Sequence, residues 1–240
     1  MSVGVQTWHY GLVARWWAEF SEGGDDLEFF QNAIRRCGEP ALDAGCGTGR
    51  LLLPLLRSGM DVDGSDVSED MLTWCADRAE TEGLSADLYQ QAMHQLDLPR
   101  RYRTVALCGS FGLGGTRFTD LEGLRRIHSH LEPGGTLVMD HYPPKRDSDY
   151  GEAQAGSLEL PCGWPEQGDR RLSSDGTELE LRTRLLTVDS VERTVTREIS
   201  VRKFVDGAEV ANESYSILSC AIQRQTSSRC LRRSGLVKSG

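Results

Sequence analysis

The apolar residues at the start of the chain recur every three or four positions, the spacing of one face of an α-helix. The pattern breaks at residues 21–24, resumes over 27–36 and ends before Gly38 and Pro40, a pair typical of a helix C-terminus. We therefore expect residues 1–36 to form a helical lid over the substrate. Its first apolar positions are Trp8, Leu12, Val13, Trp16, Trp17 and Phe20.

Between residues 37 and 144, short apolar runs alternate with amphipathic stretches of helical length. This order is typical of βαβ units, so it predicts an α/β fold with a Rossmann-like, mostly parallel sheet, flanking helices and right-handed crossovers. Ser68 is the expected N-cap of one helix, with Met71 at its N3 position. The predicted strands cover 41–44, 60–65, 86–91, 104–108 and 136–140, and the predicted helices 48–57, 68–82 and 120–131.

The pattern changes again after residue 145. Residues 145–176 are rich in Gly, Pro, Asp and Ser and are predicted to form a long loop. Apolar and polar residues then alternate over 178–186, 191–204 and 210–218, with the turn dipeptide Asp206-Gly207 before the last run. We expect an antiparallel meander of three strands with one exposed face, so that residues 145–218 form a unit on the substrate side.

Composition narrows the class of protein. The net charge of −9 disfavours a nucleic-acid substrate, because it repels a phosphate backbone. The seven cysteines include no CxxC pair, and the His and Cys positions lack zinc-site spacing, so we expect reduced thiols and no metal. No apolar run approaches the roughly 20 residues that cross a bilayer. The first ten residues contain no export signal, so we expect a cytoplasmic protein without a membrane partner.

A glycine turn joins the first predicted strand to the following helix. Gly45, Gly47 and Gly49 allow the backbone to approach a ligand closely. Asp66 follows 17 residues after Gly49, at the end of the next strand, where an acid can bind both ribose hydroxyls of a nucleoside cofactor.

Two cofactor classes compete for this turn. A dinucleotide site requires G-x-G-x-x-G, but Arg50 occupies the position of the third glycine and would crowd the helix–strand approach. Asp43 would lie near a negative pyrophosphate, whereas it suits a cofactor with an ammonium group. S-adenosylmethionine carries an ammonium, a sulfonium and a ribose, so these residues favour it over NAD.

Four motifs in order resemble class I S-adenosylmethionine-dependent methyltransferases: LDAGCGTGRLLLPLL, DVDGSDVSEDML, QAMHQLDLP and LEPGGTLVMD. The resemblance covers about residues 40–141. It is nearest to small bacterial methyltransferases with a β-meander after the fifth strand, such as sugar amine N-methyltransferases.

The resemblance implies a role for each residue that matches a motif. Asp43 would hold the methionine ammonium and Asp66 the ribose hydroxyls, and Tyr10 and Arg15 would close over the carboxylate end of the cofactor. The other implied cofactor-binding residues are Gly45, Cys46, Gly47 and Gly49 at the turn, Val67, Ala92 and Met93 at the adenine, and Cys108 and Gly109 at the methionyl tail.

The chain departs from the family pattern at two positions. Ala92 replaces the acid that usually follows the third strand, and Arg103 replaces an Asp that often enters the fourth. The adenine amino group would then depend on His94 or on a backbone carbonyl. The candidates for a general base are His141, Tyr142, His94 and Tyr10, which the sequence does not rank.

The last segment, residues 219–240, is atypical of the family. It contains no acid and little amphipathic pattern, and it is rich in Arg, Ser and Cys. We hypothesise that a frameshift or truncation follows about Leu218, so that the final antiparallel strands of a complete seven-stranded sheet are missing.

The sequence therefore predicts methyl transfer from S-adenosylmethionine to a nitrogen or oxygen atom of a small molecule. A catalytically silent cofactor-binding or scaffolding domain is the alternative, and an NAD-type oxidoreductase is disfavoured by Arg50 and the glycine spacing. A homodimer is an arrangement that the sequence leaves open.

Overall fold

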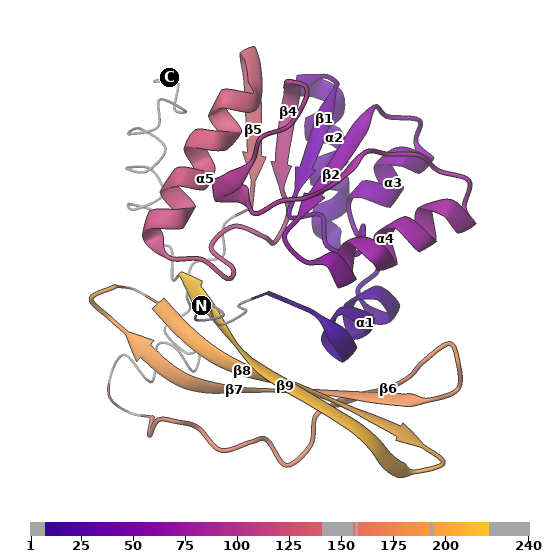
Figure 1. Cartoon of the computed structure of the whole chain (residues 1–240), viewed down its shortest axis with the longest axis vertical. Helices are drawn as coiled ribbons and strands as arrows, with labels where there is room; N and C mark the ends of the chain where they lie inside the picture. Colours follow the sequence, from indigo (N-terminus) through magenta and orange to yellow (C-terminus); the bar gives the residue numbers. More distant parts are fainter. Residues whose placement is uncertain (1–7, 141–155, 157, 193, 221–240) are drawn as a thin grey trace. The chain divides into compact units, whose positions relative to one another are not determined.

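A computed structural model describes residues 8–140, 156, 158–192 and 194–220, and their backbone forms two separate sheets (Figure 1). The described residues fall into two compact units. We call residues 21–111 and 118–140 the sheet unit, and residues 8–20, 112–117 and 156–220 the meander unit.

The sheet unit contains five strands that pair in parallel, in the spatial order β3-β2-β1-β4-β5. This arrangement confirms the predicted Rossmann-like α/β core. Sequential strands run outward from β1 in one direction and from β4 in the other, so the order reverses between β1 and β4. The strands are β1 (Ala41–Ala44), β2 (Val62–Asp66), β3 (Leu88–Gln90), β4 (Tyr102–Leu107) and β5 (Leu131–Met139).

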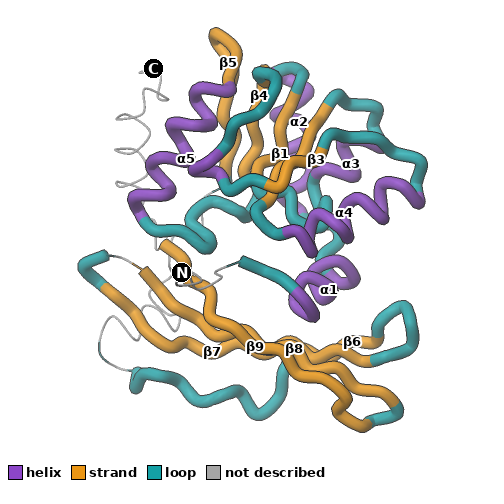
Figure 2. Tube along the Cα trace, in the orientation of Figure 1, coloured by secondary structure: helices purple, strands orange, loops and turns teal. Residues whose placement is uncertain are grey.

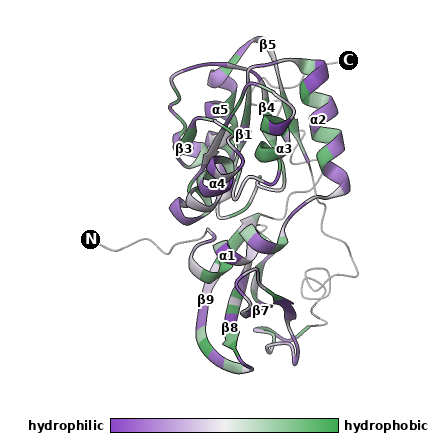
Figure 3. Ribbon diagram, turned by 90° about the vertical axis from the view of Figure 1, so that its right-hand side faces the viewer, coloured by the Kyte–Doolittle hydropathy of each residue, from purple (hydrophilic) through white to green (hydrophobic). Residues whose placement is uncertain are grey.

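Helices cover both faces of this sheet. Helices α2 (Asp25–Cys37), α3 (Leu52–Arg57) and α4 (Glu69–Thr81) pack on one face, and α5 (Arg117–His130) packs on the other. Helix α2 carries hydrophobic residues on one side and hydrophilic residues on the other, as the colours of Figure 3 show. Burial of such faces drives the packing of the layers.

Two boundaries in the sheet unit differ from prediction by more than three residues. Helix α3 begins at Leu52 rather than at residue 48, because Gly47 (φ 55°) and Gly49 (φ 88°) hold the preceding turn in the left-handed region, which a helix cannot use. Strand β5 begins at Leu131 and includes the Pro-Gly-Gly that was expected to precede it, with a register shift opposite β4.

The start of α4 matches its prediction in detail. The Ser68 hydroxyl accepts a hydrogen bond from the Met71 N–H at 3.2 Å, as an N-cap does. We expect Ser68→Ala to lower the free energy of unfolding by about 1 kcal/mol, measured by urea denaturation. Thr73→Ala, at an exposed position within the helix, is the matched control and should change it by less than about 0.5 kcal/mol. Equal effects of the two substitutions would contradict the assigned cap.

The meander unit forms an antiparallel sheet in the order β6-β7-β8-β9, whose strands are drawn in orange in Figure 2. Its strands are β6 (Asp169–Leu172), β7 (Glu178–Asp189), β8 (Thr194–Val205) and β9 (Ala208–Cys220). The three predicted strands are confirmed as β7, β8 and β9, and β6 is a fourth strand that was not predicted. Strand β6 lies within the predicted loop and has no apolar alternation, because its Asp and Arg side chains are exposed and form ion pairs. The turn between β8 and β9 is confirmed, with positive φ at Asp206 and Gly207.

Helix α1 (Gly11–Phe20) packs on one face of this antiparallel sheet through Val13 and Trp16. Its first turn is fixed by the Glu213 carboxylate, which accepts a hydrogen bond from the Leu12 N–H at 2.7 Å. Helices α1 and α2 belong to different units, so the boundary between the units falls inside the segment that was predicted as one lid. Within the described residues, no helix is long and apolar enough to cross a membrane.

Candidate functional site

The strand order places the candidate site at the carboxyl edge of β1 and β4. Ligands of open α/β sheets bind where the strand order reverses, outside the carboxyl ends of the strands. Asp43 lies in β1 opposite Ala106 of β4, and Cys108 and Gly109 follow β4 directly. The sequence-predicted residues on both strands therefore converge at the reversal point.

The glycine turn that follows β1 is held against the end of β2. The N–H groups of Gly45 and Cys46 both donate to the Ser65 carbonyl, at 2.6 and 3.0 Å. Gly45, Gly47 and Gly49 all have positive φ, which explains why glycine stands at each of them. Met71 and Cys75 of α4 lie against the turn, within 3.0 and 2.8 Å of the Cβ positions at Gly47 and Gly49.

Gly45 is the tightest position of the turn. A Cβ atom added there would lie 2.4 Å from Cβ of Ser110, whose hydroxyl donates to the Ala44 carbonyl at 2.8 Å. We expect Gly45→Ala to destabilise the protein by the cost of positive φ, roughly 1–2 kcal/mol, and by a further steric cost of about 1–3 kcal/mol.

The control for this substitution is Gly83→Ala. Gly83 also has positive φ, but an added Cβ there meets no atom within 4 Å. It should show the backbone cost alone when both variants are melted side by side. The close packing of the turn would be refuted by equal losses of stability.

Asp43 is buried, with 2% of its surface exposed, and one carboxylate oxygen has no hydrogen-bond partner among the described residues. Burial, together with the nearby Asp66 carboxylate, raises the pKa of Asp43 to about 7. A buried carboxylate oxygen without a partner is costly, so a cationic ligand at this position would stabilise it. The chemistry of this acid suits an ammonium group.

Asp66, at the end of β2, closes the glycine turn through its side chain. One carboxylate oxygen accepts the Gly47 N–H at 2.9 Å, and the other accepts the Ser68 N–H at 2.9 Å. Burial raises the pKa of Asp66, while these backbone donors oppose the shift. Each carboxylate oxygen has a second lone pair, so Asp66 retains acceptor capacity for a diol.

The residues expected at the adenine lie at the same edge. Met93 begins a short 3-10 helix (Met93–Gln95), and its methyl group lies 3.2 Å from the position of a Cβ at Gly45. Val67 and Ala92 follow β2 and β3 and are partly buried. His94 lies in the same 3-10 helix. These residues therefore lie near one another, and their contact with an adenine stays a prediction.

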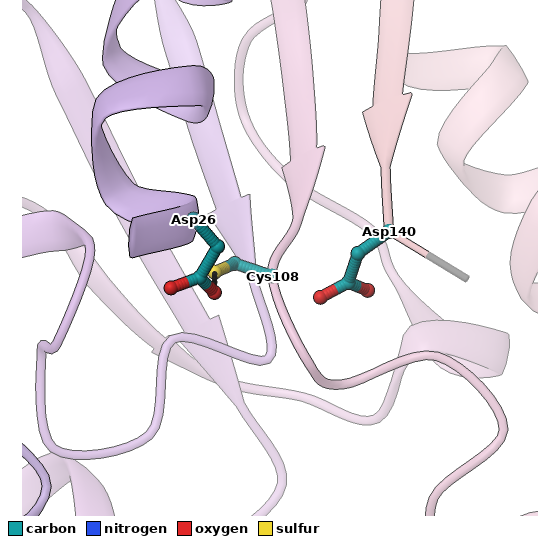
Figure 4. A group of neighbouring side chains, drawn as sticks. All are labelled: Asp26, Cys108 and Asp140. Atoms are coloured by element: carbon teal, nitrogen blue, oxygen red, sulfur yellow. Dashed lines mark hydrogen bonds between the residues drawn. The ribbon is translucent and has the colours of Figure 1, made fainter. Parts of the chain in front are cut away.

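Asp26 and Asp140 lie beside Cys108, the residue that follows β4, as Figure 4 shows. Ligand atoms of Asp26, Cys108 and Asp140 all lie within 4.8 Å of one another. The Gly109 N–H donates to Asp140 at 2.7 Å, and the Cys108 thiol donates to Asp26 at 3.4 Å. Burial raises the pKa of the Cys108 thiol.

Arg50 supplies a positive charge to this group. Its two terminal nitrogens donate to the two Asp26 carboxylate oxygens at 2.8 and 2.7 Å, and this pairing lowers the pKa of Asp26. The guanidinium lies beside Gly24 and Gly109 and does not crowd the helix–strand contact, because its side chain extends to the start of α2. Arg50 still occupies the position that a dinucleotide fingerprint needs for its third glycine.

Tyr10 and Arg15 lie in the meander unit. The Tyr10 ring stacks on Tyr215, with 4.3 Å between ring centroids. Arg15 pairs with Glu19 at 2.7 Å and with Asp175 at 2.8 Å. Their expected contact with the cofactor stays a prediction.

Only some of the candidate general bases lie within the described residues. His94 is described at the carboxyl edge of the sheet unit, whereas His141 and Tyr142 lie outside the described residues.

Several polar residues of the site were not found from the sequence. Asp26, Ser110 and Asp140 are remote along the chain from the glycine turn, and no motif spacing marks them. Arg50 was the one sequence signal that could have indicated Asp26. A guanidinium directly after the glycine turn needs an acidic partner, and the acids at 25–28 begin the nearest preceding helix.

Comparison with known proteins decides the family. Residues 41–135 match the family model described as "Methyltransferase domain". Residues 41–135 of the chain therefore form a methyltransferase domain. The domain covers β1 to the start of β5, the part of the chain that holds the glycine turn, Asp66 and Cys108.

Individual relatives agree with this assignment. An N,N-dimethyltransferase of Streptomyces venezuelae, named for dTDP-3-amino-3,4,6-trideoxy-α-D-glucopyranose, is 34% identical over 101 residues, which are 41% of this chain and 40% of the relative. The chain spans 40–53% of the length of the curated relatives it matches.

Solved structures extend the likeness to the whole fold. A sugar N-methyltransferase from Streptoalloteichus sp ATCC 53650 has a TM-score of 0.70 at 19% identity, over 98% of this chain and 90% of that chain. An amino pentose methyltransferase from Micromonospora echinaspora, solved with S-adenosylmethionine bound, has a TM-score of 0.67 at 18% identity, over 96% and 90%. At these identities the likeness shows that the methyltransferase domain and the meander share a fold with them.

Proposed function

We propose that this methyltransferase domain binds S-adenosylmethionine at the carboxyl edge of β1 and β4, and that the protein transfers the methyl group to a nitrogen or oxygen atom of a small molecule. The observation that carries the proposal is the buried Asp43 carboxylate, which has an oxygen without a partner in the described structure, beside a glycine turn closed by Asp66.

The residues present fit the cofactor group by group. Asp43 matches the ammonium, and the spare acceptor capacity of Asp66 matches the ribose diol. The glycine turn would hold the nucleoside and methionyl parts near its backbone. Val67, Ala92 and Met93 would contact the adenine, and Cys108 and Gly109 the methionyl tail.

When bound, S-adenosylmethionine supplies an electrophilic methyl group on a sulfonium. The residues of the chain would then position the acceptor in line with that methyl group and exclude water. A neutral amine attacks without a base and releases its proton afterwards. A hydroxyl acceptor would need a base, and His94 is the candidate base in the sheet unit.

An amine on a sugar nucleotide is the acceptor class that we favour. The support is the relative from Streptomyces venezuelae, whose name specifies an amino sugar carried by dTDP, together with the amino-sugar enzymes among the solved structures. A net charge of −9 fits a small acceptor better than a nucleic acid. We place the reaction in the cytoplasm, where S-adenosylmethionine is made.

The test is a turnover assay with the full chain. The protein is incubated with S-adenosylmethionine and a panel of dTDP-amino sugars and their hydroxyl counterparts, and S-adenosylhomocysteine and methylated product are quantified by mass spectrometry. We expect product with an amino sugar, and none with an Asp66→Ala control. Cofactor binding without methylation of any acceptor would favour the silent binding domain instead.

A further inference from the structure

The antiparallel sheet of the meander unit carries different side chains on its two faces. Leu179, Val201 and Ile217 pack against α1 on one face. Side chains alternate along a strand, so the residues at the intervening positions of β7 and β8 lie on the opposite face. We call this opposite face the arginine face, because it carries Arg170, Arg182, Arg184 and Arg202.

Three of the four arginines on the arginine face have a carboxylate partner. Their distances to glutamate oxygens of the same sheet are 2.7 Å for Arg170, 2.6 Å for Arg184 and 2.5 Å for Arg202. Arg182 forms no hydrogen bond or ion pair within the residues that the structure describes, and its Nε is buried without an acceptor. A buried donor of this kind in a native protein is commonly satisfied by an ordered water or ion.

The polar groups nearest to Arg182 along and across the strands already have partners. Glu180, two residues earlier on β7 and 4% exposed, accepts the Gly168 N–H at 2.8 Å through one oxygen and an Arg202 N–H at 2.5 Å through the other. Ser200 lies opposite Arg182 in the register, and its hydroxyl donates to a side chain of β9. The acceptor for Arg182 therefore has to come from a ligand or from solvent.

The guanidinium of Arg182 is held in place although it has no hydrogen bond. Its central carbon lies 5.0 Å from the centroid of the Trp164 ring, and that of Arg184 lies 4.7 Å from the same centroid. A Cβ atom added at Gly168 would lie 2.5 Å from Cγ of Arg182, so this glycine leaves room for the arginine stem. Nε is the only nitrogen of Arg182 that is buried without a partner, so its two terminal nitrogens reach solvent.

We propose that the arginine face binds a phosphate group, and that the terminal N–H groups of Arg182 hold two of its oxygens. A guanidinium matches two phosphate oxygens in a planar, bidentate pair. A free phosphate ion and the phosphate group of a small metabolite share this chemistry. The site lies within the meander unit, and it does not depend on the cofactor assignment in the sheet unit.

Arg184 favours phosphate over a carboxylate at this site. It bonds Glu198 through Nε at 2.7 Å and through one terminal nitrogen at 2.6 Å, and its other terminal nitrogen has no partner within the described residues. Arg184 and Arg182 lie against the same Trp164 ring. A phosphate has a third oxygen for the remaining Arg184 N–H, whereas a carboxylate has only two oxygens.

The experiment is arginine modification of the full wild-type chain by phenylglyoxal, with the modified residues identified by peptide mass spectrometry. Inorganic phosphate, glucose 6-phosphate and acetate are added separately at constant ionic strength, because salt screens nonspecific attraction. We expect phosphate to slow the modification of Arg182 at least about fivefold, with half-protection at about 1 mM, and acetate to slow it less than about twofold. Arg36, an exposed arginine in the last turn of α2, is the internal control and should react at the same rate throughout.

A pair of variants tests the bidentate contact itself. Arg182→Lys keeps the positive charge but loses the planar pair of N–H groups, so it should weaken phosphate binding about tenfold in a calorimetric titration. Arg36→Lys is the matched control and should change the affinity less than about twofold. Thermal melting of both variants shows that they are folded at the titration temperature.

Glucose 6-phosphate distinguishes the two sources of the phosphate group. Half-protection of Arg182 at a lower concentration than with inorganic phosphate identifies a phosphorylated metabolite, and half-protection at an equal or higher concentration identifies the free ion. Protection of Arg182 that is no stronger than that of Arg36, with both phosphates well above about 1 mM, would overturn the proposal. A folded Arg182→Lys protein that binds phosphate as tightly as the wild type would overturn it as well.

Discussion

Asp66→Ala is expected to weaken the binding of S-adenosylhomocysteine at least about 100-fold, because it removes both acceptors for the ribose hydroxyls and each charged hydrogen bond contributes about 1.5–3 kcal/mol. The Gly47 N–H also loses its partner, so the glycine turn becomes less ordered before the ligand arrives. Isothermal titration calorimetry of wild type and variant at one pH measures the effect.

Two controls separate binding from folding. Asp77→Asn changes an exposed acid on α4 and should leave the affinity unchanged. Thermal melting of Asp66→Ala without ligand shows whether the variant is folded at the titration temperature. A folded Asp66→Ala protein with wild-type affinity would remove Asp66 from the site.

The affinity for S-adenosylhomocysteine is also expected to rise with pH between about 5 and 7 and to level off above. The pKa of Asp43 is raised to about 7, so below that pH the protein must release a proton before the carboxylate can meet an ammonium. The affinity should then fall about tenfold for each pH unit below 7. Titration in buffers of different ionisation enthalpy should show protons released on binding at pH 6.

The raised pKa of Asp43 also makes the stability of the ligand-free protein depend on pH. Folding raises the pKa of Asp43 from 3.8 to about 7, so the folded state binds more protons than the unfolded state between those values. This contribution to the free energy of unfolding is full below about pH 4 and is lost as the pH rises to 7.

Asp43→Asn is the control for both effects. It should flatten the pH dependence of affinity and remove this contribution to the pH dependence of stability, while lowering affinity at pH 8. A wild-type affinity that is constant from pH 5 to pH 8 would show that Asp43 does not meet the ammonium.

Local sequence patterns predicted the features that depend on neighbouring residues. The parallel sheet, the Ser68 cap and the turn at Asp206-Gly207 follow from apolar periodicity and turn chemistry. The glycine turn and Asp66 were placed together correctly because both lie at the ends of adjacent strands, β1 and β2. The methyltransferase domain was identified from the motifs that occupy these positions.

Features that depend on distant partners were not predicted. Strand β6 has exposed, charged residues, and it is a strand because β7 supplies its hydrogen bonds. The start of α1 is fixed by Glu213, some 200 residues further along the chain. The bond between Asp26 and Arg50 is of the same kind, since it joins the start of α2 to the glycine turn. Periodicity carries no information about such pairs.

Binding of the cofactor is the central claim, and calorimetric titration of the full 240-residue chain with S-adenosylhomocysteine, in parallel with NAD⁺, tests it most directly. We predict saturable binding of one S-adenosylhomocysteine per chain and no heat of binding with NAD⁺. A folded protein that binds NAD⁺, or that binds neither compound, would contradict the assignment of this site to S-adenosylmethionine.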